Sequence, residues 1–355
     1  MRKLILILFL IPTSSFAAPF EDFKFLSGPR YDFGAEFGFY KSDGNFDKSE
    51  NTFKRHADGY GYQLMNLDLS ARTGLGPRWN IYGRTRVASA EAKTLSTGFA
   101  QTKSASGLSE LQVGSDNLLY SGSMMVFSDV ALTVPMTKTD RSANSDPAIG
   151  EGTLELEGRV VLRVERRSYR FGAFGGVTYR DQGRSMLVPY GFLAEVPVAN
   201  WNFGVDLRGY QALTLDKDSN NEFAIEMAYF CSSNGCAKQY GAFNPSILQN
   251  NLWARVNLGK EFGMHAGLSH DILGSNVSKG MNIYGGLIYR FTGSARFSNP
   301  ANSDSFTEEI HDGIDQGNFD RVNVTNPPPK KPAKPRVNLQ DELNKTEQMM
   351  EQNGN

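Results

Sequence analysis

The most regular feature of this chain is an alternation of apolar and polar residues with a period of two. From Tyr31 to Phe39 the odd positions are aromatic or alanine, whereas the even positions are glycine or acidic. In residues 153–165 the even positions are leucine, valine or glycine, and the odd positions are mostly glutamate or arginine. Successive side chains of a β-strand point to opposite faces, so this period predicts strands with one apolar and one polar face.

Twelve such segments follow one another, each about 9–14 residues long. A tilted strand crosses a membrane in about 9–11 residues, so these lengths fit membrane-spanning strands. Aromatic residues stand near the segment ends, where the interfacial girdles of membrane barrels lie. The segments are residues 31–40, 62–73, 79–90, 108–120, 123–136, 153–165, 169–180, 186–198, 201–213, 251–259, 262–272 and 281–291.

The connections between these segments alternate between short and generally longer ones. The short connections are residues 74–78, 121–122, 165–168, 199–200 and 260–261, and the longer ones are residues 41–61, 91–107, 137–152, 181–185, 214–250 and 273–280. Bacterial outer-membrane barrels have short periplasmic turns and longer outer loops. The pattern therefore predicts an all-β fold, a transmembrane antiparallel up-and-down β-barrel of twelve strands over residues 18–291, with both chain ends in the periplasm.

The strand count has an alternative. Residues 222–230 also alternate, and counting them as a spanning strand would give an odd number, whereas bacterial barrels are even-stranded. We therefore assign residues 222–247 to a hairpin in an outer loop. Fourteen strands, with one more near residues 237–247, is the alternative, but Pro245 disfavours that strand because proline lacks the donor of a strand ladder.

The amino terminus has the pattern of a secretory signal peptide. Arg2 and Lys3 are basic, residues 4–11 are apolar, and residues 15–17 are small or apolar up to a cleavage site after Ala17. We expect residues 1–17 to be removed on export, which predicts location in the outer membrane of a Gram-negative cell.

Composition narrows the protein classes further. Beyond the amino terminus, no apolar run approaches the ~20 residues of a membrane helix, which excludes a helical membrane protein. The 37 basic and 38 acidic residues nearly cancel, so a nucleic-acid partner is not expected. Two cysteines, Cys231 and Cys236, bracket a turn at Asn234-Gly235, and we expect them to form a local disulfide in an oxidising compartment.

In a porin-like barrel the polar face of each strand points inward. That face carries ten arginines and ten carboxylates, so a strongly ion-selective pore is not expected, and charges across a narrow lumen should pair. The lumen is either a narrow polar path for a small solute or a salt-bridged filling that holds the barrel round. The expected lumen-lining residues are Asp32, Glu36, Asp68, Arg72, Arg84, Arg86, Glu110, Asp116, Asp129, Glu155, Glu157, Arg159, Arg163, Arg170, Arg180, Glu195, Asp206, Arg208, Arg255, His265 and Arg290.

Catalytic and metal-binding groups are not evident. Ser269, His270 and Asp271 have the residue types of a hydrolase triad, but neighbours along one strand point to opposite faces and do not meet. No further cysteine or histidine stands near Cys231 and Cys236. We expect neither an enzyme nor a bound metal or cofactor.

The chain continues for 64 residues (355 − 291) after the last predicted strand. Residues 292–337 read as a flexible linker, first acidic and then rich in proline and lysine. Residues 338–355 are either a short amphipathic helix capped by Asn338 or a disordered end. This periplasmic tail either tethers a partner or has none, and we expect most of it to be disordered.

Three stretches of the chain resemble the meta-pathway phenol-degradation-like family of outer-membrane barrels. They are Leu118 to Met136, Ile149 to Gly152 with the strands that follow, and Gly280 to Phe291, in the family's order over roughly residues 110–291. Met136 replaces the Thr-Gly usual in the family, and the tail is not part of its pattern. The resemblance implies a transporter of hydrophobic or aromatic small molecules, and it carries over no functional side chain.

The sequence thus predicts an outer-membrane barrel that lies in lipid and passes small solutes passively. The alternative is a non-conducting structural or interaction barrel that anchors outer loops and a periplasmic tail.

Overall fold

The computed structural model describes residues 25–26, 28, 30–46, 53–56, 61–96, 99–138, 147–217 and 244–292. No helix among them is long and apolar enough to cross a membrane. The described strands are β1 (Arg30–Phe46), β2 (Phe53–Arg55), β3 (Gly61–Gly74), β4 (Trp79–Ser96), β5 (Phe99–Ser121), β6 (Met125–Pro135), β7 (Glu155–Glu165), β8 (Arg170–Arg180), β9 (Leu187–Val198), β10 (Trp201–Ala212), β11 (Ser246–Leu258), β12 (Phe262–Ser275) and β13 (Val277–Thr292).

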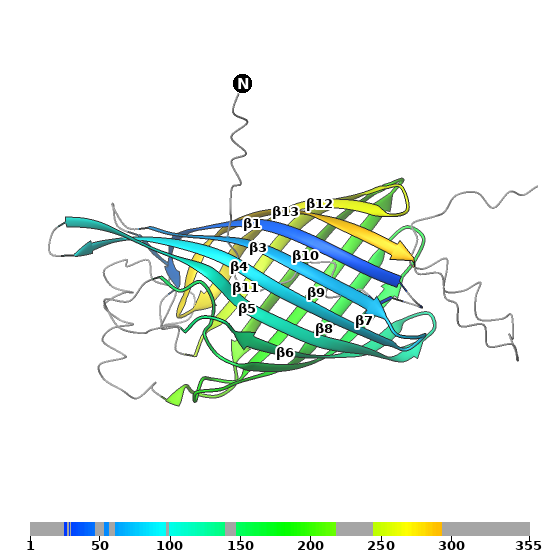
Figure 1. Ribbon diagram of the computed structural model, residues 1–355, viewed down its shortest axis with the longest axis horizontal. Helices are drawn as coiled ribbons and strands as arrows, with labels where there is room; N and C mark the ends of the chain where they lie inside the picture. The colour runs from blue at the N-terminus through cyan, green and yellow to red at the C-terminus, as the bar shows by residue number, and fades with distance from the viewer. Residues whose placement is uncertain are drawn as a thin grey trace, which may run out of the picture. The chain divides into compact units, whose positions relative to one another are not determined.

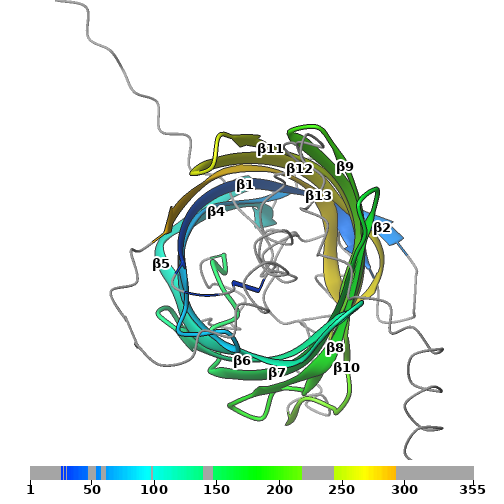
Figure 2. The same cartoon turned by 90° about the vertical axis from the view of Figure 1, so that its right-hand side faces the viewer.

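The strands form one antiparallel meander that closes on itself (Figures 1 and 2). Each strand pairs with the next, except that the three-residue β2 pairs only with the end of β1, and β13 pairs with β1 from Arg30↔Thr292 to Phe46↔Val277. The other twelve strands therefore make a closed barrel, which confirms the predicted fold and strand number. We call the end at which Arg30 and Thr292 pair the terminal end, and the opposite end the loop end.

The alternation in the sequence becomes an outer and an inner wall. In β7, Val160 is 49 % exposed on the outer wall, while its neighbour Val161 is completely buried. The outer wall is apolar along most strands, as surface that faces hydrocarbon must be, whereas the inner wall holds most of the buried charged side chains. This is the fold of an outer-membrane β-barrel.

At the loop end the strands are longer than the sequence pattern predicts. β4 and β5 extend to Ser96 and Phe99, so most of the predicted loop 91–107 is strand. β1 takes up the first residues of the predicted loop 41–61. Beyond the bilayer an outer face has no need to be apolar, and the small polar residues there, such as Ser89 and Ser104, hide the period.

Two more of the predicted loops are corrected near the carboxyl end of the barrel. Only Asn276, with a φ of 57°, separates β12 from β13 in the predicted loop 273–280. β11 begins at Ser246, directly after Pro245, and not at residue 251. β10 pairs directly with β11. The rest of the predicted hairpin, with Cys231 and Cys236, lies outside the described residues.

The last hairpin is splayed at the loop end. The pairing of β12 with β13 ends at His270↔Met281, although β12 remains paired with β11 up to Ser275, and β13 with β1 from Val277 onward. Asp271 bridges the gap, because its Oδ2 accepts a hydrogen bond from the Gly280 N–H at 2.9 Å. A side-chain carboxylate thus stands in for the missing backbone ladder.

Candidate functional site

The interior of the barrel is the candidate site, and its charged side chains are deeply buried. Arg208 is 1 % exposed and Asp206 is 2 % exposed. Ionised groups buried to this degree are stable only when they are paired and hydrogen-bonded. The predicted lumen residues should therefore be in contact with groups of opposite charge.

Asp68 of β3 holds two arginines of β4. Its Oδ2 lies 2.8 Å from Nη2 of Arg84, and its Oδ1 accepts a hydrogen bond from Nε of Arg86 at 2.8 Å. Nη1 of Arg86 also lies 3.2 Å from Oε1 of Glu110 on β5. One carboxylate therefore holds two guanidinium groups of β4, and Arg86 extends the contact to β5.

Asp129 of β6 is the centre of a second cluster. It accepts hydrogen bonds from the Tyr82 hydroxyl at 2.7 Å and from Nε of Arg159 at 2.9 Å. Arg159 also lies 3.1 Å from Glu157 on its own strand. Tyr82 is on β4, so this cluster crosses over β5 and links strands that are not neighbours.

Other predicted residues pair on β10, β11, β12 and β1. Arg208 donates to Asp206 at 2.7 Å, and Asp206 also accepts from Asn251 at 2.8 Å and from the Trp253 indole at 3.2 Å. Nε2 of His265 lies 2.7 Å from Oε2 of Glu36.

Charged groups also gather near both ends of the lumen. At the terminal end four arginines contact carboxylates: Arg72 with Asp116 at 3.0 Å, Arg170 with Glu195 at 2.5 Å, Arg163 with Glu165, and Arg290 with Asp32 at 4.0 Å. Arg255 is hydrogen-bonded to Asn257. At the loop end Arg180 donates to Ser185 at 2.6 Å and lies 3.5 Å from Glu151. Glu155 and Glu157 accept hydrogen bonds from Thr153 at 3.4 Å and Thr178 at 2.9 Å.

An aromatic cluster inside the barrel was not anticipated from the sequence. Phe25, which precedes β1, is 5 % exposed and packs against Phe127 with ring centroids 5.6 Å apart. Its cluster includes the buried rings of Phe174, Trp253 and Tyr284. The short dark-blue segment before β1 lies inside the ring of strands (Figure 2).

Two contacts hold this amino-terminal segment in place. When the Asn80 amide is oriented to satisfy its hydrogen bonds, its nitrogen donates to the Leu26 carbonyl at 2.7 Å and its oxygen accepts from the Leu26 N–H at 2.9 Å. A Cβ at Gly74 would stand 2.2 Å from the Gly28 carbonyl oxygen, so only glycine allows the segment to pass there. Phe25 precedes the first alternating segment and gave no periodic signal.

A second apolar cluster lies toward the loop end. Tyr62, Leu64 and Ala90 of β3 and β4 pack with Ile149, which belongs to the connection between β6 and β7. The Tyr62 hydroxyl donates to the Ala148 carbonyl at 2.9 Å, and the Ser109 hydroxyl donates to the Ile149 carbonyl at 2.6 Å. These bonds hold part of that connection against the inner wall.

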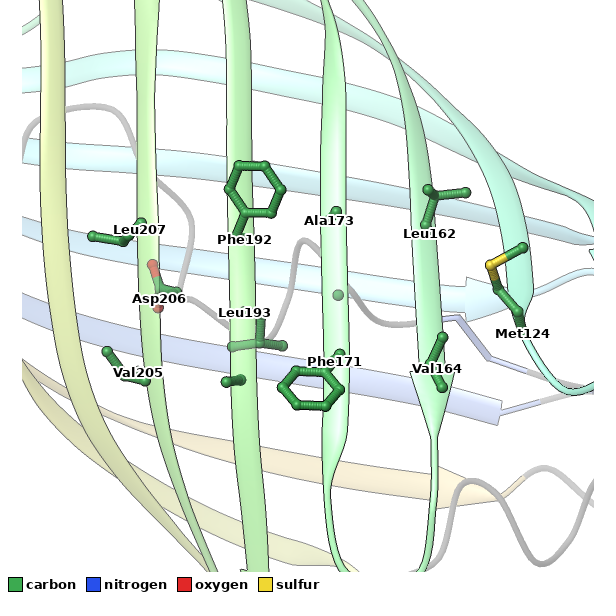
Figure 3. Close-up of a pocket in the computed structure, with 12 residues that line it drawn as sticks. Met124, Leu162, Val164, Phe171, Ala173, Phe192, Leu193, Val205, Asp206 and Leu207 are labelled. Carbon is green, nitrogen blue, oxygen red and sulfur yellow. The ribbon is translucent and has the colours of Figure 1, made fainter.

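The outer wall carries a shallow apolar hollow of about 510 Å³ across β7 to β10 (Figure 3). It forms because Ala173 is paired with Phe192, and Ala194 with Phe171, so small and large residues alternate. Its exposed rim is apolar. In a bilayer such a hollow is filled by hydrocarbon, and it offers no polar anchor for a specific ligand.

The described residues assemble neither the Ser-His-Asp group nor a metal site. Ser269 and Asp271 are buried, whereas the intervening His270 belongs to the other face of β12, so the three form no triad. Within the described ranges, no three His, Cys, Asp or Glu side chains are grouped so that they could hold a metal ion.

Comparison with known proteins identifies the fold. No protein-family model matches the chain, and no curated protein sequence is significantly similar to it. An outer-membrane channel from Pseudomonas putida F1 superimposes with a TM-score of 0.57 at 10 % identity, covering 76 % of this chain and 98 % of that one. The chain has the fold of an outer-membrane β-barrel.

Two further solved structures match less well. The NanC porin has a TM-score of 0.41 at 9 % identity, covering 72 % of this chain and 98 % of the porin. The translocator domain of the autotransporter NalP from Neisseria meningitidis has a TM-score of 0.42 at 9 % identity, covering 76 % of this chain and 91 % of that domain.

Proposed function

We propose that this barrel lies in the outer membrane and passes small solutes through its lumen, as a channel and not an enzyme. The observation that carries the proposal is the inner wall, where clusters of paired charges alternate with apolar and aromatic clusters inside a closed barrel. Two apolar clusters therefore stand beside the charged clusters inside the barrel, so the interior offers both apolar and charged side chains.

The apolar clusters favour solutes with an apolar or aromatic body. The rings around Phe25 and the residues around Ile149 lie toward opposite ends of the lumen, and the charged clusters lie between and around them. This agrees with the substrate class that the resemblance to the meta-pathway phenol-degradation-like family implies. The outer-membrane channel from Pseudomonas putida F1 supports only the fold.

The topology is part of the same proposal. The signal peptide would direct export of the chain and would then be removed after Ala17. The terminal end with its short turns would face the periplasm, and the loop end would face outward. Residues 292–355 would then lie in the periplasm as a linker and tail.

One observation favours the alternative of a non-conducting barrel. The lumen charges contact one another closely, and Phe25 sits among the aromatic rings of the interior, so the lumen is partly filled. In that case the barrel would anchor its outer loops and its tail.

Single-channel recording distinguishes the two functions. The mature chain, residues 18–355, is refolded, its folding is verified by heat-modifiable migration, and it is inserted into a planar bilayer. We expect small, discrete conductance steps. Silence from a verified folded barrel would refute passage through the lumen and favour the structural barrel.

A further inference from the structure

Two arginines of the inner wall converge on one neutral oxygen at the terminal end of the barrel. Arg255 of β11 donates from Nε and Nη2 to Oδ1 of Asn257, at 3.3 Å each. Arg290 of β13 donates from Nη1 to the same Oδ1 at 3.1 Å. Two positive groups therefore point at a single position that is occupied by an uncharged acceptor.

The contact of Arg290 with Asp32 is longer than the carboxylate contacts of several other lumen arginines. Arg84, Arg170 and Arg208 contact carboxylates at 2.5–2.8 Å, whereas Arg290 lies 4.0 Å from Asp32. The side chain of Arg290 is also 22 % exposed, so water reaches it.

The like charges continue around this end of the lumen. Arg290, Arg170 and Arg163 all repel the positive charge of Arg255, whereas Glu195 attracts it. Arg163 and Arg170 are each in contact with a glutamate, Glu165 and Glu195 respectively. An added negative charge between Arg255 and Arg290 would be attracted by both guanidinium groups.

An apolar surface adjoins the arginine pair. Trp253 precedes Arg255 by two residues on the same face of β11, a separation of about 7 Å along the strand. Its indole belongs to the cluster that contains Tyr284 and Phe25. A ligand whose charged end reached the arginines would therefore have its body on the side of this aromatic cluster.

We propose that Arg255, Arg290 and Asn257 form a subsite for a small organic carboxylate with an apolar or aromatic body. The two carboxylate oxygens would take the place of Asn257 Oδ1 between the guanidinium groups, whose planar donor forks suit this geometry. The body would lie toward Trp253. The inference rests on the proposed function for its biological meaning, because it places the subsite on the solute path where that path leaves the lumen.

Equilibrium binding tests the subsite without requiring conduction. The refolded mature chain in detergent micelles is titrated with 4-fluorobenzoate, and the probe is followed by fluorine NMR. 4-Fluorobenzyl alcohol serves as the uncharged probe of nearly equal shape. We expect saturable binding of the carboxylate that is about tenfold or more weaker in Arg255→Gln and in Arg290→Gln, since hydrogen bonds to charged groups are lost. Binding of the alcohol should not change.

Two further variants separate the subsite from general charge and from misfolding. Arg166 lies in the exposed turn after β7, where it donates to two backbone carbonyls, so Arg166→Gln removes the same charge near the same end and should leave binding unchanged. Asn257→Asp puts a fixed carboxylate between the two guanidinium groups, which should favour the fold while abolishing saturable binding of 4-fluorobenzoate.

Equal affinity of the wild-type chain and the Arg255, Arg290 and Asn257 variants would overturn the subsite, as would the absence of saturable binding to the folded wild-type chain. Failure of the proposed function has a different signature. A barrel that binds 4-fluorobenzoate but never conducts would refute passage and leave the subsite standing. A barrel that conducts without binding 4-fluorobenzoate would refute the subsite and leave passage through the lumen standing.

Discussion

At the scale of single residues, the interior depends on carboxylates that each hold several partners. Asp68 contacts two arginines, and Asp206 accepts from an arginine, an amide and an indole. Loss of one such carboxylate leaves buried positive charge behind, which costs far more than the pair itself contributes.

We therefore expect Asp68→Asn to destabilise the folded barrel by about 3–5 kcal/mol, because Arg84 and Arg86 lose their shared counter-charge. The measurement is the urea dependence of heat-modifiable migration. Lys93→Gln is the control, since Lys93 is exposed and lies 3.8 Å from Glu91, and such a surface pair contributes about 0–1 kcal/mol. Equal losses in the two variants would show that the burial of Asp68 has no energetic consequence.

At the scale of elements, two segments depart from a regular meander. The segment before β1 enters the ring of strands, and β12 separates from β13 at the loop end. In both, side-chain groups replace backbone pairing: the Asn80 amide bonds to Leu26, and the Asp271 carboxylate bonds to Gly280.

Phe25→Ala should raise the single-channel conductance, because it removes the ring that packs into the aromatic cluster of the lumen. Recording in planar bilayers measures the change. Leu75→Ala is the control, since Leu75 is an exposed side chain of the turn between β3 and β4, and its conductance should match that of the wild-type chain. A Phe25→Ala barrel with unchanged steps would place the conducting path away from this segment.

Asp271→Ala should speed hydrogen exchange at the Gly280 amide by about fivefold or more, because loss of a buried acceptor costs about 1–3 kcal/mol. Exchange is followed by NMR in micelles. The amide of Leu287 serves as the reference, because it lies where β12 and β13 are regularly paired with each other. Equal acceleration at both amides would indicate a general loosening of the barrel and not a local splay.

Neither of these two departures could be predicted from the sequence. The twelve strands could be predicted because burial on one side and lipid on the other impose a period of two. Phe25 could not, since a single ring before the first strand has no period. The period of two also puts Tyr82 and Trp253 on the inward face, because each stands between polar residues of the same parity. The strand extensions at the loop end gave no alternating pattern, because their outer faces are not apolar.

At the scale of the whole molecule, the two walls of the barrel meet different solvents. Replacing Val160 by arginine on the outer wall should cost about 2–4 kcal/mol, as expected for a cation near the bilayer midplane. The same replacement of the exposed Leu119, near the turn between β5 and β6, should cost about 0–1 kcal/mol. Unfolding from lipid vesicles measures both, and equal costs would contradict the placement of the bilayer around the middle of the strands.

The position of Phe25 has a practical consequence for the expression of this protein. If the signal peptide is cut after Ala17, only seven residues (25 − 17 − 1) separate the new amino terminus from the ring inside the barrel. Seven extended residues span at most about 25 Å. An affinity tag or fluorescent fusion added at that terminus would therefore begin beside the lumen and compete with the segment for its place. Labels for assembly or localisation experiments belong after Thr292, where the last strand has already ended.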